Sequence, residues 1–279
     1  MIKIYQYILF FLAINLFIGC SSSVTPIDTA IKDQILYLGN GTEPQDLDPH
    51  IVTGVPEHNI IIALLEGLTI SNPKGGRPLP GAAESWQISN DGRTIIFNIR
   101  KDAFWSNGDA VTADDFVYSW KRMLTPSLGA QYADMLYVVK NAEDFNKGKI
   151  EDFSQVGVTA LNSKTLKVEL INPTPYFLKL LSHYSTYPVH QGTIEKFGKI
   201  DTRGSQWTRQ ENFVGNGPFV LKNWELNKIL IVKKSETYWN SKIVSLNEIH
   251  FFPIDDVSRE DRMYRSGYLH FAYTVPLEK

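Results

Sequence analysis

Cysteine is nearly absent from this sequence, which has one cysteine among 279 residues. A single cysteine, Cys20, excludes a disulfide framework, a cysteine-ligated zinc finger and a Cys-x-x-Cys redox site. A surplus of either charge is also lacking, because 28 Lys and Arg residues stand against 30 Asp and Glu residues, a formal charge of −2. Without a basic excess to neutralise phosphates, the sequence argues against nucleic acid as a partner.

The apolar run over residues 7–19 (YILFFLAINLFIG) is shorter than the roughly 20 residues that a transmembrane helix needs. It follows Lys3 and ends at Gly19-Cys20, which is the layout of a secretory signal. Residues 16–20 (LFIGC) are similar to a bacterial lipobox, in which the cysteine is acylated and becomes the mature N-terminus. We therefore expect a signal peptide over 1–19, lipidation of Cys20, a polar tether over 20–34 and a location outside the cytoplasm, anchored to a membrane. An ordinary secreted signal and a buried N-terminal strand with a free thiol are the alternatives.

With 43% hydrophobic and 21% charged residues, the composition is that of a folded chain rather than a disordered one. Turn signals between alternating segments predict hairpins over residues 86–100, 159–170 and 219–232. Helix patterns follow Pro56 as far as Gly67 and follow Thr112 as far as Leu124, and shorter ones occur at residues 175–181, 193–197 and 258–265. Because strands and helices alternate irregularly, the sequence predicts an α+β fold.

Motifs of enzyme chemistry are missing. The sequence has no G-x-S-x-G, no H-E-x-x-H and no P-loop, and its two Gly-Asn-Gly segments lack the third glycine of a dinucleotide fingerprint. The six histidines are scattered, so a metal site would have to be assembled by the fold alone. The acidic pairs 114–115 and 255–256 fit helix starts better than paired catalytic carboxylates. We expect no enzyme activity, no cofactor and no metal.

Aromatic residues are plentiful, with 6 Trp, 13 Tyr and 15 Phe, and they suit either a core or a ligand groove. Trp86, Phe97, Phe116 and Trp120 fall on periodic apolar faces, and we expect them to pack in the core. Tyr132 lies instead in a stretch without periodicity after Pro126, and is the better candidate for an exposed ring.

Several strings resemble the extracytoplasmic oligopeptide-binding proteins of ABC importers, solute-binding protein family 5. They are residues 41–68, AESW at 83–86, IRKDAFWSNGDAVTADDFVYSW at 99–120, and residues 176–198, 212–239 and 252–256. The resemblance implies a periplasmic binding protein of type II. Lobe I would consist of residues 35–66 and the return segment 191–279, with a strand-rich subdomain inserted at 67–190. A second lobe, which closes over the ligand in this family, would be absent from a chain ending at Lys279.

In that family an extended peptide is held mainly through its backbone. Carried over by residue, Thr53-Gly54-Val55 match the stretch that pairs with the peptide, and Thr53 replaces an acidic residue there. Tyr132 matches an aromatic near the peptide, and Tyr273-Thr274 fall near a further ligand-proximal stretch. The ligand-binding candidates are thus Thr53, Val55, Tyr132, Tyr273 and Thr274.

The resemblance implies the binding component of an importer, with an oligopeptide ligand and with ABC permease and ATPase subunits as partners. Because a half-cleft leaves polar contacts open to water, we expect weak peptide binding by this chain alone. The alternative is a surface lipoprotein with an interaction or adhesive role.

Overall fold

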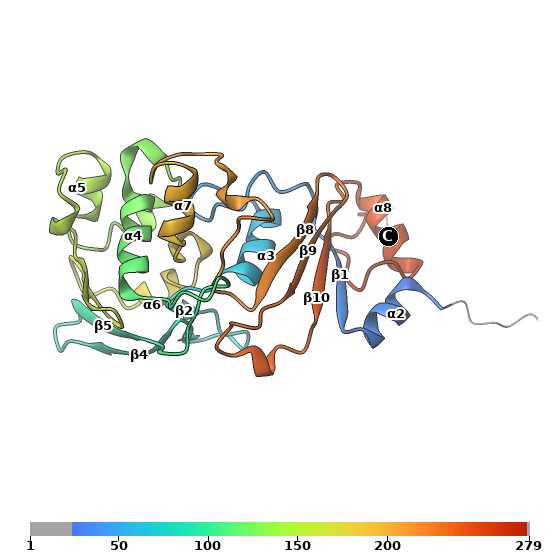
Figure 1. The fold of residues 1–279 in the computed structure, drawn as a ribbon, viewed down its shortest axis with the longest axis horizontal. Helices are drawn as coiled ribbons and strands as arrows, with labels where there is room; N and C mark the ends of the chain where they lie inside the picture. The colour runs from blue at the N-terminus through green and yellow to red at the C-terminus, as the bar shows by residue number, and fades with distance from the viewer. Residues whose placement is uncertain (1–23, 278–279) are drawn as a thin grey trace, which may run out of the picture.

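The computed structural model describes residues 24–277 and contains two four-stranded sheets with helices between and beside them (Figure 1). The first sheet has the order β1-β10-β9-β8, in which only the β1–β10 pair is parallel. Its strands are β1 (Ile35–Gly39), β10 (Glu248–Phe252), β9 (Ile229–Lys234) and β8 (Phe219–Glu225). Strands from both ends of the described chain therefore form one sheet.

The second sheet is antiparallel throughout and has the order β4-β5-β7-β6. Its strands are β4 (Ala83–Ile88), β5 (Thr94–Ile99), β7 (Thr165–Glu169) and β6 (Val158–Asn162), and a small ribbon pairs β2 (Thr69–Ile70) with β3 (Leu79–Pro80). The three predicted hairpins are confirmed as β4–β5, β6–β7 and β8–β9. Two of their turns use left-handed backbone, at Gly92 (φ +69°) and Asn227 (φ +58°), as turn chemistry requires.

Seven α-helices surround these sheets in the described part of the chain, and the predicted α+β class is confirmed. They are α2 (Pro26–Lys32), α3 (Val55–Leu64), α4 (Ala113–Leu124), α5 (Ala142–Asn146), α6 (Phe177–Leu180), α7 (Gln191–Phe197) and α8 (Val257–Arg265). Helix α3 lies between the first sheet and the rest of the molecule, whereas α2 and α8 lie beyond the opposite face of that sheet (Figure 1). Among residues 24–277 we find no helix with the length and apolar character to cross a membrane.

Part of the predicted tether is a helix. Thr25 caps α2 in a capping box with Asp28, Pro26 occupies the first turn, and Ala30 is buried. The prediction of a tether rested on the polar composition of this segment. It overlooked the helix start that Thr25 and Asp28 encode. Cys20 and the predicted signal peptide lie outside the described residues.

The predicted helix after Pro56 ends earlier than expected. Ile60, Ile61 and Leu64 are fully buried as predicted, but α3 stops at Leu64 rather than at Gly67. The cause is distant in sequence, because the Leu64 carbonyl accepts a hydrogen bond from Gly217 N (3.0 Å). The Asn216 side chain also accepts a hydrogen bond from Glu66 N and donates one to the Glu66 carbonyl, at 2.9 Å each.

Helix α4 begins as predicted, with a capping box between Thr112 and Asp115. Its Phe116, Trp120 and Leu124 are buried against the second sheet and neighbouring loops. Asp256 likewise caps α8 by accepting a hydrogen bond from Arg259 N (2.8 Å). The acidic pairs at both positions thus start helices.

Candidate functional site

Two of the predicted ligand residues come from segments 79 positions apart and meet at the start of α3. The Tyr132 hydroxyl lies 3.5 Å from the carbonyl oxygen of Thr53, a long hydrogen bond. Thr53 is exposed, and Tyr132 is half-buried rather than a free ring, because it packs against the main core. Val55 is 49% exposed and is the first residue of α3, so its backbone N–H has no acceptor within the helix. This corner therefore places a backbone N–H that has no acceptor within the helix beside an aromatic ring.

Two further rings pack against Tyr132, and a third packs behind them. Its ring is 5.1 Å from that of His183 and 6.3 Å from that of Tyr184, both edge-to-face, and His58 of α3 lies 5.4 Å from Tyr184. The Tyr184 hydroxyl donates to the Val52 carbonyl (2.9 Å), which fixes the loop before α3. Burial lowers the pKa of His183, helped by the nearby His58, and burial also lowers the pKa of His58. Burial thus favours the neutral form of both histidines beside the Tyr132 ring.

The loop that carries Thr53 is tied to α3 by polar side chains. Asn40 donates to the Pro56 carbonyl (3.1 Å) and accepts from the Asn59 amide (3.0 Å). Glu57, which is 5% exposed, accepts from Gln45 N (2.7 Å). The backbone at the start of α3 is thus held before any ligand arrives, which lowers the entropy cost of binding.

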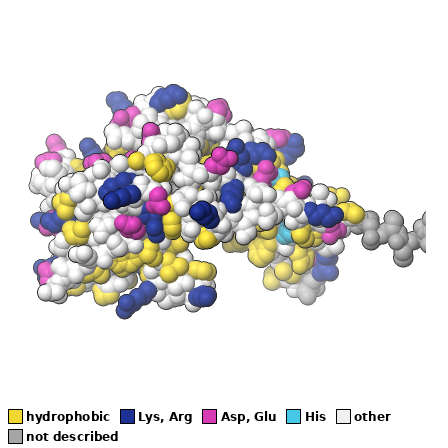
Figure 2. All heavy atoms as spheres, turned by 60° about the horizontal axis from the view of Figure 1, so that its bottom comes forward, with side chains coloured by type: hydrophobic (Ala, Val, Ile, Leu, Met, Phe, Trp, Pro, Cys, Tyr) yellow, Lys and Arg dark blue, Asp and Glu magenta, His cyan; other side chains and the backbone are white. Residues whose placement is uncertain are grey.

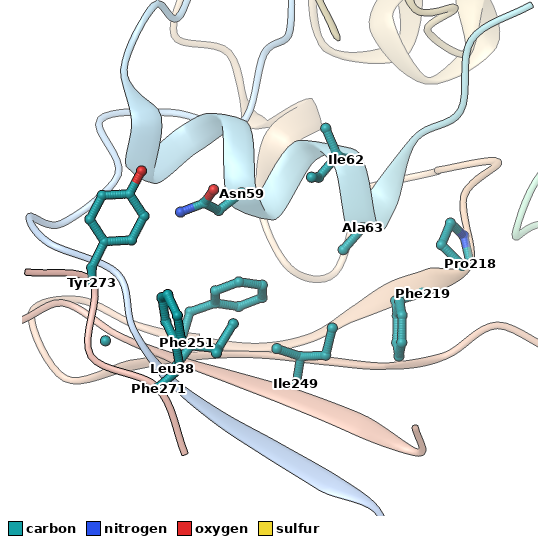
Figure 3. A pocket seen from close by; sticks show the side chains of 11 residues that line it. Leu38, Asn59, Ile62, Ala63, Pro218, Phe219, Ile249, Phe251, Phe271 and Tyr273 are labelled. Atoms are coloured by element: carbon teal, nitrogen blue, oxygen red, sulfur yellow. The ribbon is translucent and has the colours of Figure 1, made fainter. Parts of the chain in front are cut away.

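A hollow of about 490 Å³ lies between α3 and the first sheet. Leu38, Ile249 and Phe251 form its apolar floor, and Asn59 points into it from α3 (Figure 3). Val55, Asn59 and Ile62 follow at i, i+4 and i+7, so the exposed face of α3 continues from the Thr53 corner along this hollow. Ile62, which also lines the hollow, is 42% exposed.

Tyr273 stands at the other wall of the hollow, and its hydroxyl points toward the first turns of α3 (Figure 3). Its side chain is 49% exposed, and Thr274 next to it is exposed too. The structure therefore brings Tyr273 to the same helix that begins at Val55. Asn59 of α3 and Tyr273, which both line the hollow, are 214 positions apart in the sequence. Thr274 faces Glu260 instead, through its hydroxyl (3.1 Å to Oε2).

A second hollow of about 310 Å³ lies on the other side of Ile62. Its lining includes Glu66, which is buried and accepts hydrogen bonds from Tyr238 Oη (2.6 Å) and Trp239 Nε1 (2.8 Å). Burial raises the pKa of Glu66 to about 7, although these hydrogen bonds and the charge of Arg100 act in the opposite direction. The guanidinium of Arg100 lies 3.5 Å from the centre of the Trp239 ring. Glu66 thus joins the end of α3 to the segment after β9.

The surface shown in Figure 2 has hydrophobic side chains gathered along its lower part and charges of both signs scattered elsewhere. No single-sign field for a polyanion is visible on that face. Among the described residues, no group of three or more His, Cys, Asp or Glu side chains could hold a metal ion.

Sequence reasoning missed the residues that hold the site, namely Asn40, Glu57, His183 and Glu260. Asn40 stands in the Gly39-Asn40-Gly41 segment, whose sequence resembles no more than an incomplete dinucleotide motif and gives no sign of these hydrogen bonds. Each Gly-Asn-Gly segment contains a glycine that close packing requires. A Cβ on Gly39 would lie 1.8 Å from Glu260 Oε1, and one on Gly217 would lie 2.5 Å from the Leu64 carbonyl carbon.

Curated relatives share sequence with most of this chain. The chain is 41% identical over 253 residues to the periplasmic oligopeptide-binding protein OppA of Escherichia coli K12, covering 90% of this chain and 45% of that protein. It is 39% identical over 251 residues to the dipeptide-binding protein DppE of Bacillus subtilis 168, covering 88% of this chain and 44% of that protein. The chain thus spans about half the length of the curated relatives that it matches.

Solved structures show the same fold. The Haemophilus influenzae OppA complex with the peptide RPPGFSPFR superposes with a TM-score of 0.83 at 40% identity, covering 88% of this chain and 47% of that one. The murein tripeptide binding protein MppA of Escherichia coli gives a TM-score of 0.82 at 35% identity, over 88% of this chain and 47% of that one. The fold is therefore that of periplasmic binding proteins of this type.

Residues 77–279 match the family described as "Bacterial extracellular solute-binding proteins, family 5 Middle". This match covers more than half of the chain and agrees with the relatives and the fold. The chain belongs to family 5 of the bacterial extracellular solute-binding proteins.

Proposed function

We propose that this chain provides ligand contacts in the substrate-binding component of an ABC importer for oligopeptides. The exposed face of α3 carries the proposal, because it joins the Thr53–Tyr132 corner to Tyr273 across an apolar hollow. An extended peptide would pair its backbone with Thr53 and the free N–H of Val55, and would place side chains against the rings. The relatives named as oligopeptide- and dipeptide-binding proteins support this ligand class.

We also propose the division of the chain that the family resemblance implies. Residues 35–66 and 191–279 belong to lobe I, and residues 67–190 form the inserted subdomain. The composition of the first sheet supports this division, because β1 precedes the proposed insertion and β8, β9 and β10 follow it. Thr274 belongs to the proposed site with Tyr273, at the end of the described chain.

The test is a peptide titration followed by nuclear magnetic resonance, which detects weak binding. A mixture of tripeptides to pentapeptides should shift the amide signals of Thr53, Val55 and Tyr273. Tyr132→Ala should weaken binding by about tenfold, since buried aromatic contacts contribute on the order of 1 kcal/mol or more. Tyr176→Ala is the matched control, because Tyr176 is an exposed tyrosine on a different element.

The peptide function would be contradicted if Tyr132→Ala bound peptides with the wild-type affinity. It would also be contradicted if the chain bound a macromolecule and no peptide. The second result would instead fit an interaction or adhesive role. Submicromolar binding of a tripeptide would contradict only our expectation that this chain alone binds weakly.

We propose further that the protein is a lipoprotein anchored outside the cytoplasm through Cys20, with residues 1–19 removed as a signal peptide. The apolar run and the Gly19-Cys20 junction support this, and the relatives named as periplasmic proteins support the compartment. The intact mass of the protein from its native membrane tests it. Acyl chains on a species beginning at Cys20 are expected, and Cys20→Ala should abolish them.

A further inference from the structure

Glu260 is a buried carboxylate whose hydrogen-bond donors come from two consecutive residues near the site. It is 1% exposed on α8, and its Oε1 accepts from Tyr273 N at 2.8 Å. Its Oε2 accepts from Thr274 N at 3.3 Å and from Thr274 Oγ1 at 3.1 Å. These bonds offset the cost of burying a carboxylate and are stronger than bonds between neutral groups.

The same carboxylate packs on the end of β1. A Cβ on Gly39 would lie 1.8 Å from Glu260 Oε1, so only glycine leaves room for the carboxylate there. Gly39 also lines the apolar hollow, together with Tyr273. The residues before Tyr273 run along β1, since His270 N donates to the Tyr37 carbonyl (3.0 Å) and Gly39 N donates to the Phe271 carbonyl (3.3 Å). Glu260 fixes Tyr273 and Thr274, which lie one residue beyond this pairing.

We infer that Glu260 is a positioning residue of the ligand site, which sets the place of Tyr273 and Thr274 relative to α3. This inference rests on the proposed peptide-binding function. Without the carboxylate, the backbone N–H groups of residues 273 and 274 lose their acceptor. The half-exposed Tyr273 ring then keeps its edge-to-face packing on Phe271 (ring centres 6.5 Å apart) but loses the anchor of its backbone. A ligand would then have to order this segment when it binds, which weakens its affinity.

Glu260→Gln tests this with little change in volume, because the glutamine amide turns a donor group toward donors that need an acceptor. Asp255→Asn, on an exposed residue nearby, is the control for the lost charge. Asp256→Ala is the control for a destabilised α8, because it removes the helix cap without touching Tyr273 or Thr274. Each variant of the full chain is titrated with the same tripeptide-to-pentapeptide mixture, and amide hydrogen exchange is followed in parallel.

In Glu260→Gln we expect about tenfold weaker peptide binding and faster exchange at Tyr273 and Thr274, the loss anticipated for a hydrogen bond to a charged group. Both controls should keep the wild-type affinity. Unchanged exchange at these two amides, or an equal loss of affinity in Asp256→Ala, would overturn the inference.

Failure of the proposed function gives a different pattern. Suppose that the wild-type chain binds none of the peptides, while Glu260→Gln still speeds amide exchange at residues 273 and 274. Both the proposed peptide function and the ligand-positioning role of Glu260 would then be wrong. The change in exchange would then support Glu260 only as the residue that holds this segment on β1.

Discussion

The guanidinium of Arg122 donates hydrogen bonds to both carboxylate oxygens of Asp48, from Nη1 to Oδ1 at 2.8 Å and from Nη2 to Oδ2 at 2.6 Å. Both side chains are excluded from solvent, at 0% and 2% exposure. Asp48 lies in the loop before α3 and Arg122 lies on α4, so the pair joins the loop that carries Thr53 to α4. The ring of His50 adds a contact of its Nδ1 with Arg122 Nη1 (3.0 Å).

Removing one partner of this pair should strongly destabilise the fold. Arg122→Met leaves the Asp48 carboxylate buried without its cation, and we expect a loss of about 3–5 kcal/mol in the free energy of unfolding. Urea denaturation measures it. Lys147→Ala is the control, because it breaks an exposed pair with Glu143 and should cost less than about 1 kcal/mol. Equal losses of free energy of unfolding in the two variants would show that the buried pair contributes no more to stability than the exposed one.

His50 should make the fold sensitive to mild acid. Burial, and next the charge of Arg122, lower the pKa of His50 from 6.5 to about 4. Because the pKa is lower in the folded state, the stability linked to His50 is present above pH 6.5 and is lost as pH falls toward 4. The loss is at most about 3 kcal/mol for this difference in pKa.

His50→Gln tests this linkage, because a neutral amide can accept from Arg122 and donate to the Tyr187 carbonyl as the neutral ring does. The free energy of unfolding of the variant should depend less on pH between 6.5 and 4 than that of the wild type. Unfolding curves measured at several pH values give the comparison. Parallel pH profiles for the two proteins would show that His50 is not the group responsible.

Glu66 should act in the opposite direction. Its pKa rises from 4.5 to about 7, chiefly through burial, so the folded state holds a proton that the unfolded state has released. The linked stability is fully present below pH 4.5 and is lost as pH rises through 7, by at most about 3 kcal/mol. Glu66→Gln should remove this decline from the pH profile of unfolding.

Glu43→Gln is the matched control for Glu66→Gln, since Glu43 also accepts a hydrogen bond from a tryptophan (Trp224 Nε1, 2.8 Å) but is half-buried. If both variants change the pH profile equally, the effect arises from the lost tryptophan bond rather than from the buried proton. The difference between each variant and the wild type must be compared, because the His50 effect overlaps in pH.

Local signals predicted the elements that they encode within a few residues. The capping box at Thr112 and the turn at Gly92 needed no distant partner, and both were predicted. The end of α3 at Leu64 was missed because Gly217, 153 positions later, takes its carbonyl. In the site, family resemblance predicts Thr53 and Tyr132, and the lack of periodicity around Tyr132 also favours an exposed ring there. Glu260 has no such signal, because its packing against Gly39 exists only in the folded chain.

The Gly-Asn-Gly segment at residues 215–217 yields the last prediction. Gly217 lies against the end of α3, where an added Cβ would meet the Leu64 carbonyl carbon at 2.5 Å and Leu65 N at 2.6 Å. Both neighbours are backbone atoms that hydrogen bonds hold in place, so they cannot move aside as a side chain could. Gly217→Ala should therefore destabilise the protein by about 1–3 kcal/mol or more.

Gly192→Ala is the control and should cost much less. Gly192 lies in helix α7, and the nearest atom to an added Cβ is His190 Cε1 at 3.3 Å, a side-chain atom that needs to move by only a few tenths of an ångström. Alanine favours helix over glycine by roughly 0.5–1 kcal/mol, which offsets the small shift that the capping ring of His190 must make. Thermal or urea unfolding of the pair decides the question. If Gly217→Ala proved as stable as Gly192→Ala, the close approach of residue 217 to α3 would not be what requires glycine there.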